Sequence, residues 1–196
     1  ERSSRFWRLI LLSMLWLRLN GVRCLLWLIL LALPVGAEAS EDLLGARFSP
    51  VAGNPDALGF ALEDRFGEVR RLSQHRGQVV VVNFWATWCG PCLAELPTMQ
   101  ALWERLSDGP FELLAINVGE ESSTIDRFLN GFDPPLGFRI LMDPEMRVVR
   151  EWQVRGIPTT YVVDRQGRLA EFAEGGIDFT DDLVVGRIRR LMDEGG

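Results

Sequence analysis

Two stretches of the chain are apolar at nearly every position, without the alternation that a half-exposed strand shows. They cover 78–86 (QVVVVNFWA) and Phe111–Val118 (FELLAINV), and both are rich in β-branched and aromatic residues. Continuous runs of this kind are typical of strands that are buried on both faces, as in a parallel sheet. We therefore expect two core strands, with other elements covering both of their faces.

Between these runs the pattern changes to a helical one. Leucines, Met99 and Trp103 recur at three- and four-residue spacing over 91–106, which predicts an amphipathic helix. Ser122 or Ser123 is the expected N-cap of the next helix, because serine side chains accept hydrogen bonds from free helical N–H groups. The helices predicted after the first one cover 122–131, 145–152 and 180–192.

Shorter alternating segments complete the pattern. Two pairs of them flank tight turns that contain glycine, and we expect each pair to form an antiparallel hairpin. The first pair is 59–64 with 68–72, the second is 159–164 with 168–174, and 138–142 is a single short strand. The order of elements predicts an α/β domain with a mixed sheet and helices on its faces.

The amino-terminal segment has a different pattern from the rest of the chain. It carries five arginines and two apolar runs, 9–17 and 24–35. Neither run reaches the roughly 20 apolar residues that a membrane-spanning helix needs. The second run has the length of a signal-peptide core, and it ends in small residues that include Ala37 and Ala39, which is typical of a cleavage site.

We therefore expect three parts in the chain. Residues 1–39 are predicted to be a signal peptide or an uncleaved membrane anchor, 40–54 a linker and 55–196 one folded domain. Export would place the domain in the periplasm or at the extracytoplasmic face of the membrane, with a tether if the segment is kept. In such compartments disulfides form and persist.

Composition narrows the classes of function. The 47% hydrophobic content supports a substantial core, and the net charge of −6 argues against a nucleic-acid-binding surface. All 21 basic residues are arginine, so no lysine can form a Schiff base or act as a catalytic amine. Nothing in the sequence calls for a cofactor.

Two of the three cysteines, Cys89 and Cys92, stand three positions apart, directly after a predicted core strand. Cys24 lies in the amino-terminal segment and is expected to be lost with it. The pair is compatible with a metal site, a structural disulfide or a redox-active dithiol. The exported part has a single histidine, His75, so a zinc site lacks ligands. A disulfide that closes so short a loop adds little stability.

The redox interpretation gives each cysteine a task. Cys89 precedes the predicted helix, where free N–H groups and the helix dipole stabilise a thiolate. Cys92 lies one turn further along, close enough to form a disulfide but expected to be more buried. Cys89 can then attack a disulfide of another protein, and Cys92 can resolve the mixed disulfide. Gly90 and Pro91 form the tight turn that begins the helix.

The stretch FWATWCGPC resembles the active-site motif of the thioredoxin superfamily. VNFWATWC, with Asn83 and Thr87, is similar to the exported TlpA/ResA/DsbE-like thiol–disulfide oxidoreductases, as are the early hairpin and the helix inserted before the later GIPTT. The resemblance covers about residues 55–192. It implies a thioredoxin fold with an N-terminal β-hairpin and an inserted helix, and an enzyme that exchanges thiols and disulfides.

The resemblance also implies roles for single residues. Pro158 would be the cis-proline that faces the disulfide, preceded by Ile157, which would tune the thiols. Where ordinary thioredoxins have a buried aspartate, this chain has Asn83, and the resemblance makes Glu120 the candidate for moving the proton of Cys92. Trp88, Gly90, Pro91 and Ile157 are the expected substrate contacts, and Cys89, Cys92, Pro158 and Glu120 the expected catalytic set.

Three further residues have plainer interpretations beside a functional one. His75 lies in a polar segment and is expected at the surface. Glu95, one turn after Cys92, could affect its titration, but an exposed helical acid is the expectation. Thr159 follows Pro158 where members devoted to cytochrome c maturation carry a glutamate, so the resemblance leaves the substrate open.

The leading functional hypothesis is an exported reductant of specific protein disulfides, for example in cytochrome c or copper-oxidase maturation. It would take electrons from a membrane thiol donor. The alternatives are an exported oxidant or isomerase and a thioredoxin-fold copper chaperone, although such carriers use a wider cysteine spacing and a later histidine. A peroxidase would need a different cysteine loop, and no metal site is expected.

Overall fold

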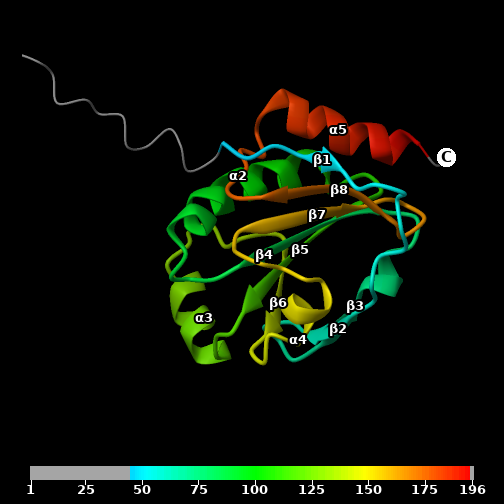
Figure 1. The fold of residues 1–196 in the computed structure, drawn as a ribbon. Coiled ribbons are helices and arrows are strands. Elements are labelled where there is room, and N and C mark those ends of the chain that lie inside the picture. The colour runs from blue at the N-terminus through cyan, green and yellow to red at the C-terminus, as the bar shows by residue number, and fades with distance from the viewer. Residues whose placement is uncertain (1–44, 195–196) are drawn as a thin grey trace, which may run out of the picture. The chain divides into compact units, whose positions relative to one another are not determined.

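The computed structural model of the protein describes residues 45–194. Its main sheet has six strands in the order β1-β8-β7-β4-β5-β6, and a separate hairpin pairs β2 with β3 (Figure 1). The strands are β1 (Ser49–Pro50), β2 (Ala61–Glu63), β3 (Val69–Arg71), β4 (Val79–Trp85), β5 (Phe111–Val118), β6 (Arg139–Asp143), β7 (Thr159–Val163) and β8 (Leu169–Glu174). This mixed sheet with flanking helices is a thioredoxin fold, with the predicted hairpin and inserted helix.

Helices lie on both faces of the sheet. Figure 1 shows α2 and α5 on one side and α4 on the other. The helices are η1 (Leu72–His75, a 3-10 turn), α2 (Gly90–Leu106), α3 (Ser122–Leu129), α4 (Arg147–Glu151) and α5 (Asp182–Asp193). Among residues 45–194, no helix combines the length and the apolar character needed to cross a membrane.

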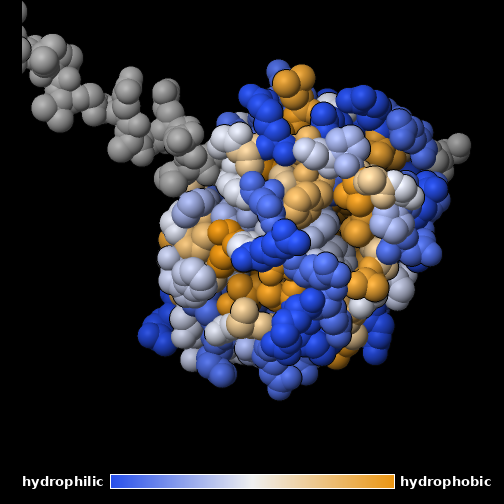
Figure 2. All heavy atoms as spheres, in the orientation of Figure 1, coloured by the Kyte–Doolittle hydropathy of each residue, from blue (hydrophilic) through white to orange (hydrophobic). Residues whose placement is uncertain are grey.

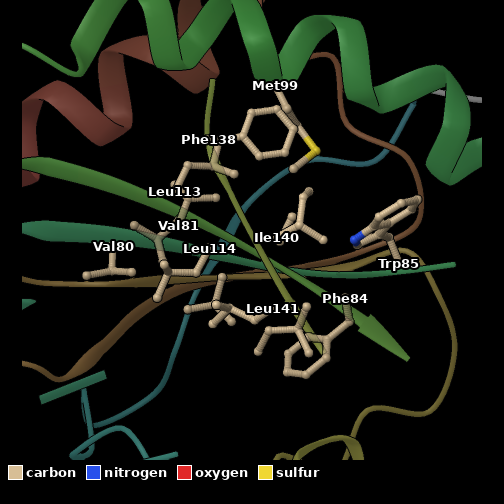
Figure 3. Close-up of a cluster of buried hydrophobic side chains, with 14 of the residues drawn as sticks. Val80, Val81, Phe84, Trp85, Met99, Leu113, Leu114, Phe138, Ile140 and Leu141 are labelled. Atoms are coloured by element: carbon tan, nitrogen blue, oxygen red, sulfur yellow. The ribbon is translucent and has the colours of Figure 1, made fainter. Parts of the chain in front are cut away.

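The central strand β4 explains why the apolar run 78–86 shows no alternation. It is parallel to β5, with Trp85 opposite Asn117, and antiparallel to β7, with Asn83 opposite Thr160. Every residue of β4 is buried. Figure 3 shows the apolar side chains packing on both faces of the sheet, which fixes the strand that leads into the cysteines.

Most predicted elements are present, and β5 has the predicted bounds. The N-cap of α3 was predicted wrongly: it is Glu121, whose backbone oxygen accepts from Thr124 while no side chain caps the helix. Helix α4 begins at Arg147 rather than at 145, because the buried Asp143 carboxylate accepts from the N–H groups of Arg147 and Val149. These hydrogen bonds set the first turn of α4.

The segment before the core is part of the sheet where it is described. β1 pairs with β8, with Ser49 opposite Phe172, inside the range 40–54 that was expected to be a linker. The predicted signal peptide or anchor, 1–39, lies outside the described residues. In the space-filling view, hydrophobic residues are visible between hydrophilic ones across the middle of this face of the domain (Figure 2).

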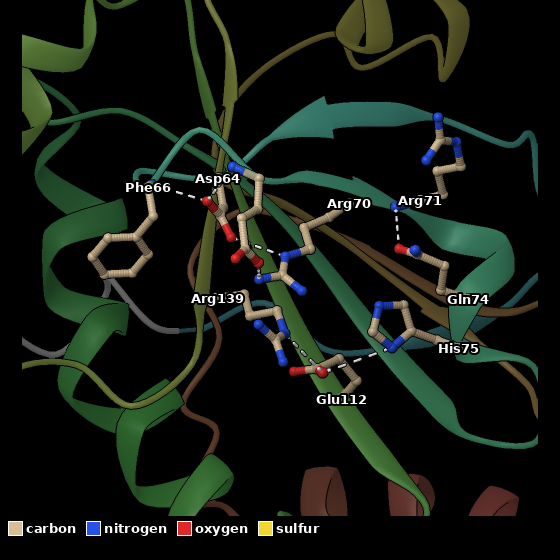
Figure 4. A network of polar contacts seen from close by, with 9 residues as sticks. Asp64, Phe66, Arg70, Arg71, Gln74, His75, Glu112 and Arg139 are labelled. Atoms are coloured by element: carbon tan, nitrogen blue, oxygen red, sulfur yellow. Dashed lines mark hydrogen bonds and ion pairs between the residues drawn. The ribbon is translucent and has the colours of Figure 1, made fainter.

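A polar network joins the β2–β3 hairpin to the sheet edge (Figure 4). Asp64 accepts from Arg70 at 2.9 Å, and Glu112 lies between His75 and Arg139, at 3.7 and 3.2 Å. The prediction of a surface His75 is wrong: its side chain is only 10% exposed, since β5 supplies Glu112 beside it. This histidine belongs to a structural cluster.

Candidate active site

Cys89 is the N-cap of α2. Its Sγ accepts a hydrogen bond from the Cys92 N–H at 3.3 Å, and its own N–H donates to Ala86 at the end of β4. Gly90 and Pro91 form the first turn, where the missing N–H of proline costs nothing. The strand thus delivers Cys89 to a helix N-terminus, where a thiolate receives an N–H bond and the favourable end of the dipole.

The two cysteines form a disulfide and differ in access. Cys89 is 5% exposed, whereas Cys92 is 0% exposed. Trp88, directly before Cys89, is 71% exposed. A substrate can therefore approach Cys89 beside Trp88, while Cys92 has no exposed surface. This asymmetry suits attack by the first thiol and resolution by the second.

The segment before β7 meets the disulfide. The Ile157–Pro158 peptide bond is cis, as predicted. The Ile157 carbonyl oxygen lies 3.6 Å from the Cys89 Sγ, and Pro158 itself is buried. Residues almost seventy positions apart in the chain therefore form one surface around the accessible sulfur. A second cis bond, Asp133–Pro134, was not anticipated, because turn prolines carry no sequence signal for it.

Glu120 lies at the loop that precedes Cys89. Its carboxylate accepts from the Thr87 N–H at 2.7 Å, from the Thr87 hydroxyl at 2.5 Å and from the Asn117 amide at 2.8 Å. These bonds tie the end of β5 to the residues between β4 and α2. Glu120 is thus placed to position the loop that carries Trp88 and Cys89. Its predicted part in moving the proton of Cys92 stays a prediction.

The carboxyl group behind Cys92 is that of Glu95, and the expectation of an exposed helical acid is wrong. Glu95 is fully buried and follows Cys92 by three residues, so the two lie on one face of α2. One carboxyl oxygen accepts from the Ile177 N–H at 2.6 Å and the other from the Asn83 amide at 3.1 Å.

Burial raises the pKa of Glu95 to about 8, against the lowering effect of the hydrogen bonds from Ile177 and Asn83. A carboxyl with such a pKa holds a proton at neutral pH and can release it there. Cys92 gains or loses a proton whenever the disulfide opens or closes. Glu95 follows Cys92 by one helical turn and is buried like it, so it is a candidate for exchanging that proton.

Asn83 links Glu95 to the strand that follows the cis-proline. Its amide nitrogen also donates to the Thr160 hydroxyl at 3.0 Å, while its carbonyl oxygen has no partner in the described part of the chain. The sequence motif singled out Asn83 but did not predict its hydrogen bond to Glu95. The spacing of Glu95 from the buried Cys92 and Leu96 was the signal that could have done so.

An apolar recess opens beside Cys89, with a volume of about 380 Å³. Its lining includes Trp88 and Ile157, two of the expected substrate contacts, together with Met146, Val149 and Arg155. Gly90 and Pro91 stay in the first turn of α2 and do not line it. Across residues 45–194, no three His, Cys, Asp or Glu side chains are grouped as metal ligands would be.

Comparison with known proteins agrees with this geometry. Residues 54–172 match the AhpC/TSA family. Thiol-disulfide oxidoreductase ResA of Geobacillus kaustophilus is 37% identical over 125 residues, 64% of this chain and 71% of the relative. ResA of Halalkalibacterium halodurans is 30% identical over 169 residues, 86% of this chain and 90% of that protein.

Solved structures of thiol–disulfide exchange proteins have a similar fold. The crystal structure of a putative thiol:disulfide interchange protein DsbE from Chlorobium tepidum superposes with a TM-score of 0.66 at 29% identity, covering 71% of this chain and 96% of the other. The chain has two cysteines at a helix N-terminus and a cis-proline segment beside the accessible sulfur. The relatives and this geometry lead to the same conclusion. The chain belongs to the AhpC/TSA family of thioredoxin-like proteins and is a thiol–disulfide oxidoreductase of the ResA/DsbE type.

Proposed function

We propose that this oxidoreductase works as a reductant outside the cytoplasm. In its dithiol form, Cys89 would attack a disulfide of a specific partner protein, and Cys92 would then close the Cys89–Cys92 disulfide and release the reduced partner. A thiol donor in the membrane would restore the dithiol. Trp88, Ile157 and Pro158 would contact the partner polypeptide.

The observation that carries the reductive direction is the environment of Cys92. The sulfur is fully buried, and the network behind it consists of Glu95, Asn83 and Thr160, with a carboxyl and no cation. Burial disfavours a thiolate, and a protonated Glu95 supplies no positive charge that would stabilise one. A dithiol whose second thiolate is not stabilised gives up its electrons readily, whereas strong oxidants have a stabilised reduced form.

The partner class follows from the relatives only in outline. Proteins named ResA and DsbE are thiol–disulfide oxidoreductases, and apocytochrome c or a protein that assembles a copper site would be suitable partners. Thr159 after the cis-proline favours neither.

An exported location is supported by the arginines, apolar core and small-residue stretch of residues 1–39. Cell fractionation with protease treatment of intact spheroplasts would test it, and protection of the domain would contradict export.

An oxidant or isomerase is the competing function within the same chemistry. The Cys92 N–H that points at the Cys89 Sγ favours it, because this bond stabilises the Cys89 thiolate and hence the reduced form. The buried environment of Cys92 thus favours a reductant, whereas the hydrogen bond to the Cys89 Sγ favours an oxidant. The reduction potential of the pair decides which effect is larger.

The test is the equilibrium potential of Cys89–Cys92 in the purified protein, measured against glutathione and dithiothreitol buffers. A value near or below about −250 mV supports the reductant, and a value near about −120 mV would make the protein an oxidant. Cys89→Ser serves as the control, since it removes the couple and keeps the fold. Absence of any reversible two-electron couple in the wild type would return the pair to a structural role.

A further inference from the structure

The recess beside Cys89 has an apolar interior and two exposed apolar walls. Val118 and Val149 are buried at its base, while Trp88 and Met146 are 71% and 42% exposed. Ile157 lines the recess with its side chain and places its carbonyl oxygen 3.6 Å from the Cys89 Sγ. A polypeptide that brings a cysteine to Cys89 beside Trp88 and Ile157 can therefore lie over this recess.

Met146 is held over the recess by its backbone. It has left-handed dihedral angles (φ 55°, ψ 32°) as the N-cap of α4, and its N–H donates to the Asp143 carbonyl at 3.0 Å. The Gly119 N–H donates to the same carbonyl, and a Cβ at Gly119 would lie 3.4 Å from the Met146 sulfur. The Met146 side chain thus lies across the glycine, where a flexible thioether can adapt to different apolar partners.

Arg155 supplies the charge of the recess. It is exposed, it is the one charged residue among those that line the recess, and none of the ion pairs in the described part of the chain includes it. An unpaired guanidinium at the rim of an apolar surface favours a carboxylate on the occupant. It disfavours a lysine or arginine there by like-charge repulsion.

We infer that this recess selects disulfides in which the attacked cysteine is flanked by a bulky apolar residue, with an acidic residue close by that reaches Arg155. The occupant is an extended polypeptide. The inference rests on the proposed reductive function and adds a substrate class to it: Met146 and Trp88 contact the apolar side chain, and Arg155 contacts the acid.

The reaction balances without a further reagent. The Cys89 thiolate attacks the flanked cysteine, the substrate S–S bond breaks, and the other substrate cysteine leaves as a thiol after taking a proton. The Cys92 thiol then loses its proton and attacks the Cys89 Sγ, which releases the flanked cysteine as the second thiol. Two electrons pass from the protein dithiol to the substrate disulfide.

The test uses four synthetic peptides, each as a symmetric disulfide-linked dimer. The cysteine is flanked by leucine or serine, and a glutamate or a lysine stands two positions away. Single-turnover reduction by the full chain in its dithiol form is followed by tryptophan fluorescence. We expect about tenfold faster reduction of leucine than of serine peptides, and about threefold faster reduction of glutamate than of lysine peptides.

Two variants and a matched control separate the contacts. Arg155→Glu should reverse the preference between glutamate and lysine, and Met146→Asn, which suits left-handed dihedrals, should remove most of the leucine preference. Arg189→Glu, the same charge reversal on the exposed face of α5, should leave both preferences unchanged. Equal rates for all four peptides would overturn the inference while the proposed function stands. Failure to reduce any peptide, and insulin as well, would overturn the proposed function itself.

Discussion

The two sulfurs of the active-site disulfide face environments of opposite character. On the outer side, Cys89 borders a recess whose walls are Trp88 and Met146, apolar residues exposed to solvent. On the inner side, the buried Cys92 shares a face of α2 with Glu95, which accepts from Asn83, and solvent is excluded from both polar residues. The usual arrangement of polar outside and apolar inside is reversed on both sides.

This reversal separates recognition from proton transfer. An exposed apolar surface gains free energy when a partner covers it, so the outer side serves binding. A buried carboxyl has a pKa that is moved toward neutrality, so the inner side serves titration. One disulfide joins the two sides, because Cys89 is its accessible sulfur and Cys92 its buried one. Variants on each side should therefore affect different observables.

The largest effect is expected at the disulfide itself. Cys92→Ser should reduce steady-state turnover by about a thousandfold or more, since the mixed disulfide between Cys89 and the partner cannot be resolved. The covalent complex should accumulate and be visible by mass spectrometry and on non-reducing gels. Cys89→Ser, the control, should give neither turnover nor complex. Turnover by Cys92→Ser near the wild-type rate would contradict the assigned roles.

Next in size is the removal of the inner carboxyl. Glu95→Gln should slow resolution by Cys92 by about a hundredfold at neutral pH, since a positioned acid or base contributes such factors. The pH dependence of resolution should lose its inflection near the Glu95 pKa of about 8. Stopped-flow measurement of single turnovers across this range provides the test. An unchanged pH profile would remove Glu95 from the mechanism.

Glu95→Gln should also change how the free energy of unfolding depends on pH, and linkage fixes the direction of this change. The ordinary pKa of the Glu95 carboxyl is 4.5, and in the folded oxidised protein it is about 8. Its contribution to folding is therefore fully present below about pH 4.5 and is lost as pH rises to 8, because the unfolded chain ionises first. Relative to wild type, the free energy of unfolding of Glu95→Gln should gain on the order of 5 kcal/mol across this range. Urea unfolding of both proteins at several pH values measures it.

A smaller effect is expected at Glu120, which holds the loop before Cys89. Glu120→Gln weakens the bonds to the N–H and hydroxyl of Thr87 and should lower the free energy of unfolding by about 1–2 kcal/mol. If Glu120 only positions the loop, the pH profile of resolution stays as in wild type. A profile changed as in Glu95→Gln would instead show that Glu120 moves the proton of Cys92. Glu121→Gln, on the neighbouring exposed acid, is the matched control.

The smallest effect is expected on the outer side. Trp88→Ala removes one wall of the recess, and KM for a leucine-flanked disulfide peptide should rise about threefold to tenfold. The reduction potential should stay within a few millivolts, since the inner network is untouched. Steady-state kinetics and redox titration test this together. A shift of the reduction potential without a change in KM would contradict the assignment of Trp88 to partner binding.

Local pattern was sufficient for much of the fold. The run Phe111–Val118 is buried at every position except the half-buried Glu112, and its length and β-branched residues matched the bounds of β5. The motif around Cys89 predicted the helix start, and the resemblance predicted the cis Pro158. In each case the residues that decide the structure are neighbours in the sequence or belong to one motif.

The misplaced residues depend on distant parts of the chain. Glu95 is buried because Ile177, eighty-two positions later, lies against it and donates to its carboxyl. His75 is enclosed because β5 supplies Glu112. The recess is lined by residues that follow β4, β5 and β6 and by the segment before β7. Periodicity within one helix or turn cannot reveal what another segment places against it.

The carbonyl oxygen of Asn83 is free to accept a further hydrogen bond in the described part of the chain. The amide donates to Glu95 when the carboxyl is ionised, and a half-turn about its terminal bond would exchange donor for acceptor and let the same side chain accept from a protonated Glu95. The Thr160 hydroxyl, which now accepts from the amide, can reverse its role in the same way. An aspartate at this position would add a second charge and could serve only one of these states. The neutral amide lets the interior gain and lose a proton with a hydrogen-bonding partner ready for each form.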